Sequence, residues 1–194
     1  MTAAATQARL QPLEPPYDPD VDRYLGQLMP PDSGLDPFKL FRTVALNFDL
    51  ASRMRPLSAG LLAHGSIDPC ERELVILRTT FLNGAEYEWG VHATLFNELS
   101  PEKIEATAGL ADSWRGSDAL LIRLCDELHA TSQVSDELWE ALRDQWSDEQ
   151  LVELLILAGW YRTISYVING LRIELEPWAQ RFPRSRQRSA APRP

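Results

Sequence analysis

Hydrophobic residues along this chain recur at helical spacing, and polar capping residues mark where the runs begin. The stretch over residues 73–82 is apolar on nearly every side, which predicts a buried helix. Just before it, Asp68 is expected to cap the helix, with Pro69 at the first position and Glu71 at the third, as in a capping box. The pattern therefore predicts a helix from Pro69 to about residue 82.

The same signals predict helices along most of the chain. Serine caps, proline at first helical positions and glycine at helix ends give expected helices over residues 38–47, 50–64, 86–99, 101–109, 117–131, 135–145 and 151–171. The last of these follows Ser147-x-x-Gln150, a second capping box. No window shows the sustained alternation typical of a strand. The predicted fold is an all-α bundle of about seven or eight helices.

Three segments differ in composition. Residues 1–37 are rich in proline and aspartate, which predicts an extended N-terminal arm with one short helix near residues 21–27, of the kind that wraps a partner subunit. Residues 38–180 carry the predicted helices and are expected to form one domain. Residues 181–194 are rich in arginine, proline and serine, so we expect a disordered basic tail and assign it no function.

Composition and charge narrow the classes of function. With 44% hydrophobic and 24% charged residues, the chain is long enough for one domain with a core. It has no signal-peptide pattern and no run of about eighteen apolar residues, so we expect a soluble, cytoplasmic protein without membrane contact. All 28 acidic residues but only 14 of the 19 basic ones precede Arg181, and the resulting charge of −14 repels nucleic acid. The arm and the apolar helices predict a homo-oligomer.

The candidate catalytic residues are Glu73, Glu88 and His92. Glu88 and His92 are four residues apart in a predicted helix and share a face, while the Glu73 helix approaches across a short turn. A carboxylate raises the pKa of a neighbouring imidazole, and burial raises that of a carboxyl group, so this set can donate and accept protons near neutral pH. Two simpler interpretations stay open: Glu73 pairs with an arginine that fixes packing, and Glu88 complements a helix dipole.

Three further side chains are candidates for substrate binding. Tyr87 and Trp89 flank Glu88 and can wall a pocket for an apolar or aromatic substrate, although aromatic residues in a buried helix also serve as plain core. Arg162 is embedded in the long apolar helix and can pair with Glu73 or bind a substrate carboxylate.

Metal, disulfide and cofactor sites are not indicated. Cys70 and Cys125 are far apart and form no Cys-x-x-Cys pair. Glu88 and His92 with Glu73 form a minimal alternative metal set, but no further histidine clusters nearby, so we expect no metal. We also expect no cofactor, and a small molecule as substrate.

A longer motif resembles a known family. The stretch Arg72-Glu73-Leu74-Val75-Ile76-Leu77-Arg78, followed by Gly84-Ala85-Glu86-Tyr87-Glu88-Trp89 and by His92, closely resembles the carboxymuconolactone decarboxylase-like family, which has the helical AhpD-like fold. The resemblance implies a compact helical protomer that assembles into dimers, trimers or hexamers, with its site lined by the motif helices. In the family's alkylhydroperoxidase branch, two cysteines stand seven and four residues before the motif histidine; here these positions hold Ala85 and Glu88.

This departure bears on the expected chemistry, because the thiolate is the nucleophile in peroxide reduction. The family's decarboxylases use placed acids and bases without a cofactor, and the sequence retains such groups. We therefore expect a cofactor-free lyase, decarboxylase or isomerase that acts on a small carboxylated or phenolic metabolite. The alternatives are an alkylhydroperoxidase-like antioxidant protein, which a reactive Cys70 or Cys125 of low pKa would support, and a non-catalytic helical oligomer, which an exposed His92 without a cavity would support.

Overall fold

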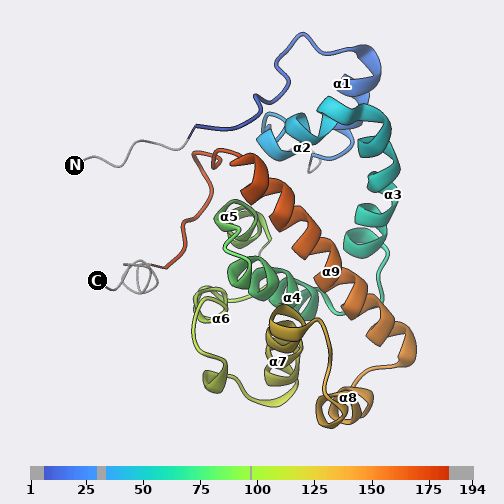
Figure 1. Ribbon diagram of the computed structural model, residues 1–194, viewed down its shortest axis with the longest axis vertical. Helices are drawn as coiled ribbons and strands as arrows, with labels where there is room; N and C mark the ends of the chain where they lie inside the picture. The colour runs from blue at the N-terminus through green and yellow to red at the C-terminus, as the bar shows by residue number, and fades with distance from the viewer. Residues whose placement is uncertain (1–6, 30–33, 97, 184–194) are drawn as a thin grey trace, which may run out of the picture.

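The computed structural model describes residues 7–29, 34–96 and 98–183. Within these ranges all regular structure is helical, with nine α-helices, two short 3₁₀ helices and no strand, which confirms the all-α prediction (Figure 1). Eight of the α-helices fall in the expected domain and one in the expected arm. The elements are α1 (Pro19–Gly26), α2 (Lys39–Val44), η1 (Ala45–Asn47), α3 (Phe48–Ala63), α4 (Pro69–Leu82), α5 (Glu86–Leu95), α6 (Pro101–Ala106), η2 (Ala111–Ser113), α7 (Gly116–Thr131), α8 (Asp136–Arg143) and α9 (Asp148–Leu171).

The centre of the fold is α4, which packs against α5, α7 and α9. Every residue of α4 from 73 to 81 is buried, as its all-round apolar pattern predicts. The Asp68 side chain accepts a hydrogen bond from the backbone N–H of Cys70 at 2.8 Å, which caps the helix as expected. The Glu71 carboxylate instead accepts a hydrogen bond from the indole N–H of Trp146 at 3.0 Å, and so ties α4 to the connection between α8 and α9.

The long helix α9 crosses the molecule and covers α4 and α5 (Figure 1). Its N-terminus has the complete capping box of Ser147 and Gln150, as the sequence predicts. By length and composition α9 is apolar enough to cross a membrane. Polar residues interrupt its apolar sequence, so it contains no continuous apolar run of that length. Its buried residues recur at three- and four-residue spacing and pack on α4 and α5, which is the arrangement of a core helix.

The turn from α4 to α5 brings the candidate catalytic residues together. Gly84 has a φ of +67°, a left-handed conformation that glycine adopts without strain, and the chain reverses there. The backbone N–H of Ala85 donates to the carbonyl of Thr80 at 2.9 Å, which closes the turn. Because the turn is short, α5 lies directly beside α4, and the residues that α5 turns toward α4 come from its middle turns.

Several helices end earlier than the sequence suggests, and contacts at the ends of α5 and α6 show why. Helix α5 stops at Leu95 rather than residue 99, and Phe96 has an extended backbone and stacks on the His92 ring at 4.5 Å between ring centroids. Helix α6 stops at Ala106 rather than residue 109. There the carbonyls of Thr107 and Gly109 accept hydrogen bonds from the Arg78 guanidinium at 2.9 and 2.8 Å, so a tertiary contact takes the place of further helix.

The described part of the N-terminal segment packs against other helices of the same chain. Helix α1 packs Tyr24 and Leu25 against Ala51 of α3, and the Tyr24 hydroxyl donates to the Ala51 carbonyl at 3.3 Å. Before α1, the backbone N–H of Arg9 donates to the carbonyl of Leu171 at the end of α9, at 2.9 Å. Contact of the arm with a partner subunit stays a prediction, and residues 184–194 of the expected tail lie outside the described part of the chain.

Candidate active site

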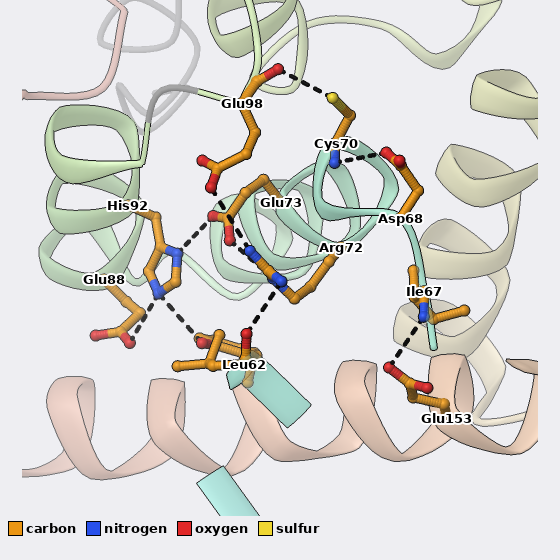
Figure 2. Close-up of polar contacts among 11 residues, drawn as sticks. Leu62, Ile67, Asp68, Cys70, Arg72, Glu73, Glu88, His92, Glu98 and Glu153 are labelled. Carbon is orange, nitrogen blue, oxygen red and sulfur yellow. Dashed lines mark hydrogen bonds and ion pairs between the residues drawn. The ribbon is translucent and has the colours of Figure 1, made fainter. Parts of the chain in front are cut away.

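Glu73 and His92 form a buried pair between α4 and α5 (Figure 2). The Nδ1 atom of His92 lies 2.7 Å from Oε2 of Glu73, and the two residues are 4% and 1% exposed. The buried apolar run of α4 holds the carboxylate out of water, while α5 presents the imidazole from its middle turn. Such a short contact in a dry environment requires a proton on the shared hydrogen bond and fixes the orientation of the ring.

Arg72 connects this pair to the neighbouring elements. Its Nε donates to the second carboxylate oxygen of Glu73 at 3.2 Å, and its Nη1 donates to the carbonyl of Leu62 on α3 at 3.1 Å. The same guanidinium lies 3.7 Å from a carboxylate oxygen of Glu98 (Figure 2). Glu73 therefore pairs with an arginine, as its simpler interpretation predicted, and it contacts His92 as well.

The other ring nitrogen of His92 faces two further polar groups. Its Nε2 lies 3.2 Å from the hydroxyl of Tyr161, which comes from α9, and 3.6 Å from Oε1 of Glu88, one turn earlier on α5. The Tyr161 ring contacts the imidazole edge-on, at 5.2 Å between ring centroids, whereas the Phe96 ring stacks on it. Contacts at both ring nitrogens and packing against two aromatic rings thus fix the orientation of the imidazole.

The charges around His92 favour its protonated form. Burial by itself lowers the pKa of His92, but the carboxylates of Glu73 and then Glu88 raise the pKa, to about 9. At neutral pH the ring is therefore an imidazolium that donates from Nδ1 to Glu73 and presents its Nε2 proton to Tyr161 and Glu88. Burial, followed by the same two carboxylates, raises the pKa of Tyr161 well above its ordinary value, so that hydroxyl keeps its proton.

Glu88, His92 and Tyr161 line a cavity of about 130 Å³. For comparison, an apolar protein cavity of about 150 Å³ admits one benzene-sized molecule. Most of the wall is apolar and comes from α2, α3, α5 and α9, with contributions from Leu28, Phe38, Leu40, Phe41, Val44, Met54, Leu62, Val91, Leu95, Phe96, Trp160 and Ile164. Glu73 does not line the cavity and lies behind the His92 ring. Only Glu88, His92 and Tyr161 of this polar group can touch a bound molecule there.

Tyr87 and Trp89 lie outside this cavity. The Tyr87 hydroxyl donates to Glu176 at 2.7 Å and accepts from the backbone N–H of Leu40 at 3.1 Å, so it joins α5 to the start of α2 and to the C-terminal segment. Trp89 is 1% exposed, and its indole N–H donates to the hydroxyl of Thr107 at 3.0 Å. The structure thus gives both aromatic residues packing contacts that hold α5 in position.

Arg162 does not line this cavity but a second one, together with Leu128 and Cys125 of α7. Its guanidinium donates to the carbonyl of Leu128 at 2.9 Å and to the hydroxyl of Tyr166 at 2.6 Å, on the side of α9 that faces α7. The first cavity contains a different arginine, Arg55, together with Ser58, both from α3. The sequence of α3 has no pattern that indicates a site. Tyr161 could have been singled out, because it lies in a long apolar helix and a buried tyrosine hydroxyl requires a hydrogen-bond partner.

Neither cysteine has the character of a reactive thiol. Cys125 is buried among α4 and α7, and burial raises its pKa to about 12. Cys70 is exposed, donates to the carbonyl of Glu98 at 3.1 Å, and has a pKa that burial and then the neighbouring Asp68 raise. In the part of the chain that the structure describes, no group of three or more His, Cys, Asp or Glu side chains is arranged to hold a metal ion.

Comparison with known proteins identifies the fold and the motif segment. Residues 49–125, which include nearly all of α3 and the whole of α4 and α5, match the model of the carboxymuconolactone decarboxylase family. An uncharacterized peroxidase-related protein from Silicibacter sp. TM1040 superposes with a TM-score of 0.77 at 15% identity, over 94% of this chain and 100% of that one. The alkylhydroperoxidase AhpD core of an uncharacterized peroxidase-related protein from Ralstonia eutropha JMP134 gives 0.77 at 16% identity, over 88% of this chain and 93% of that one.

These matches confirm the resemblance to the carboxymuconolactone decarboxylase family and the AhpD-like fold. At such low identity the two solved structures are evidence for the fold alone. A search of curated proteins finds no match to the chain.

Proposed function

We propose that this protein is a cofactor-independent acid–base enzyme, a lyase, decarboxylase or isomerase that acts on a small carboxylated or phenolic metabolite. The observation that carries the proposal is the meeting of the Glu88 carboxylate and the His92 imidazolium on the wall of one mostly apolar cavity. A proton acceptor and a proton donor side by side in a dry site are what such chemistry needs.

In an isomerisation, Glu88 removes a proton from a carbon made acidic by a neighbouring carbonyl group. The C–H electron pair moves into the enolate, whose oxygen accepts hydrogen bonds from Nε2–H of His92 or from the Tyr161 hydroxyl. The proton on Glu88 exchanges with water, and Glu88 then delivers a proton to a different carbon. Glu73 keeps the ring oriented and charged through Nδ1 but touches no substrate, so its role is positioning.

In a decarboxylation, the electron pair of the breaking carbon–carbon bond stays on the substrate while carbon dioxide leaves. The carbanion or dienolate accepts the Nε2 proton of His92, and the neutral ring then regains a proton from water by way of Glu88. Glu73 favours recharging of the ring, because the pKa of His92 lies near 9 in its presence. Neither scheme uses a thiol or an added oxidant.

The alternative proposal, an alkylhydroperoxidase-like protein, draws support from the peroxidase-related names of the structural neighbours. It requires a thiolate, and the positions of the expected redox cysteines hold Ala85 and Glu88. Cys70 and Cys125 both have raised pKa values. A purely non-catalytic oligomer is disfavoured by the burial of His92, since an ion-paired imidazole at a cavity wall costs desolvation that packing alone does not require.

Removal of both thiols tests the proposal against the peroxidase alternative. With Cys70 and Cys125 both replaced by serine, turnover should be nearly unchanged, because no step of the proposed chemistry passes through sulfur. The assay is carbon dioxide release or isomerisation of a panel of one-ring and short-chain carboxylic acids and phenols, with circular dichroism as the control for folding. Loss of activity in a folded double variant, together with cysteine-dependent peroxide reduction by the unmodified protein, would contradict the acid–base proposal.

We also propose that the protein is a homo-oligomer located in the cytoplasm. Leu46, Leu50 and Leu57 around α3 and Val152 and Ile156 on α9 are large apolar residues that are exposed in the single chain. Both cysteines are free, which suits a reducing compartment. Light scattering at micromolar concentration should give a mass that is a multiple of 21.9 kDa. A monodisperse monomer would contradict the oligomer.

A further inference from the structure

Arg55 is a charged residue on the cavity wall that the proton-transfer chemistry leaves unused. It comes from α3, and among the described residues nothing forms a hydrogen bond or an ion pair with its guanidinium. Two other arginines in this region do have partners. Arg53 pairs with Asp49 on the exposed side of α3, and Arg72 pairs with Glu73. A half-buried guanidinium without a partner in an apolar cavity is an open site for an anion.

Arg55 lies on the same face of α3 as Leu62, the residue that connects α3 to the Glu73–His92 pair. Arg55, Ser58 and Leu62 are three to four residues apart, lie on one face of α3, and all line the cavity. The carbonyl of Leu62 accepts a hydrogen bond from Arg72, which contacts Glu73, so this end of α3 is next to the Glu73–His92 pair. At a rise of about 1.5 Å per residue, Arg55 is about 10 Å farther along the helix.

The positive charge of Arg55 affects groups inside the cavity. Burial raises the pKa of the Tyr24 hydroxyl, and the positive charge of Arg55 opposes that rise. Tyr24 lines the same cavity from α1. Inside the cavity, Arg55 is also the cation that offsets Glu88 when an anionic ligand enters, because the charge of His92 is already shared with Glu73 behind the ring.

We propose that Arg55, assisted by the Ser58 hydroxyl, binds the carboxylate of a one-ring or similarly short acid and so directs the other end of the molecule to Glu88 and His92. This inference rests on the proposed acid–base function and names its substrate class. The cavity volume of about 130 Å³ limits the body of the ligand to about one ring. A guanidinium binds a carboxylate through two parallel N–H donors, which fixes orientation as well as charge.

The assignment places a condition on any decarboxylation in this cavity. An ion pair with Arg55 stabilises the carboxylate in the ground state, so the group held there is the one that the product retains. A substrate for decarboxylation therefore carries a second carboxyl group, which leaves from the end near His92. An isomerisation substrate needs only one.

Binding of benzoate and benzamide tests the inference with two ligands of nearly equal shape and different charge. Titration calorimetry at pH 7 and fixed low salt measures both with the full-length protein and with Arg55→Gln, Arg55→Lys and Arg53→Gln. Arg53 is the matched control, because it is on the same helix but exposed and paired with Asp49. Circular dichroism of each variant checks that the helical content is retained.

We expect the unmodified protein and Arg53→Gln to bind benzoate at least about tenfold more tightly than benzamide. Arg55→Gln should abolish that preference while leaving benzamide binding unchanged, and Arg55→Lys should restore part of it. Equal binding of the two ligands by the unmodified protein, no binding of benzoate, or an unchanged preference in Arg55→Gln would overturn the inference.

The failure of this inference can be told apart from failure of the proposed function. Glu88→Gln should still bind benzoate through Arg55, since it removes a negative charge from the cavity. If benzoate binding depends on Arg55 but turnover does not depend on Glu88 or His92, the carboxylate site stands and the acid–base function fails. If turnover depends on Glu88 while Arg55→Gln leaves the preference for benzoate unchanged, the function stands and the carboxylate site fails.

Discussion

Replacement of Glu88 by glutamine should lower turnover about 10²–10⁴-fold, the usual contribution of one general acid or base. Glutamine keeps the shape of the side chain and an oxygen atom near His92 but cannot accept a proton from substrate. His92→Asn should cost a similar factor, because it removes the Nε2 proton donor. The rate to compare is kcat on the best substrate in the panel, since loss of a proton-transfer group acts on the chemical step more than on binding.

Glu86→Gln is the matched control for this variant. Glu86 is also in the first turn of α5, but its carboxylate accepts a hydrogen bond from the backbone N–H of Phe182 at 2.9 Å and does not line the cavity. Its replacement should leave kcat nearly unchanged. Equal rates for the Glu88 and Glu86 variants would show that α5 contributes only charge at its N-terminus, as the helix-dipole interpretation requires.

Replacement of Glu73 by leucine should lower the free energy of unfolding by about 3–5 kcal/mol, the cost of removing one partner from a buried ion pair. The Nδ1–H of His92 and the Nε–H of Arg72 both lose their acceptor, and the two side chains are only 4% and 12% exposed. Glu73→Gln keeps an amide oxygen for Nδ1 and should cost less. Urea unfolding measures both, and Glu140→Gln on the exposed face of α8 serves as the control.

The pH dependence of the Glu73→Gln effect has a definite sign. The pKa of His92 is raised from 6.5 to about 9 in the folded protein, so the pair contributes its full stability below about pH 6.5 and loses it as the pH rises through 9. The difference in unfolding free energy between the unmodified protein and Glu73→Gln should therefore narrow between pH 6.5 and pH 9. NMR titration of His92 should show a lower pKa in the variant. A difference that widens with pH would contradict the pairing of a charged His92 with Glu73.

Local patterns in the sequence were sufficient to predict the scaffold of the site. The cap at Asp68, the apolar surroundings of Glu73 and the four-residue spacing of Glu88 and His92 are short-range features, and the structure has each of them. The contact between Glu73 and His92 also follows from them, because the reversal at Gly84 is short. Helix periodicity and turn chemistry therefore fix which groups of α4 and α5 face each other.

The rest of the cavity depends on contacts between distant segments. Tyr161 reaches His92 because α9 crosses over α5, and Arg55 reaches the cavity because α3 packs along its edge. Nothing in the spacing of either residue specifies that meeting. The choice of Arg162 as the substrate-binding arginine rested on its place in an apolar helix, but its guanidinium is occupied by the Leu128 carbonyl and the Tyr166 hydroxyl. Arg162 lines a second cavity, beside Cys125 and Leu128, and not the one that contains His92, so helix composition alone does not tell which cavity a side of the helix faces.

Deuterium incorporation from heavy water into a carbon of the substrate tests the central claim most directly. The panel acids are incubated in deuterium oxide with the unmodified protein, Glu88→Gln and the double cysteine variant, and the products are analysed by mass spectrometry and NMR. The account predicts solvent deuterium at one carbon with the unmodified protein and the cysteine variant, and loss of most of that incorporation with Glu88→Gln. Equal incorporation with and without the Glu88 carboxylate, or incorporation that disappears only when the cysteines are removed, would contradict it.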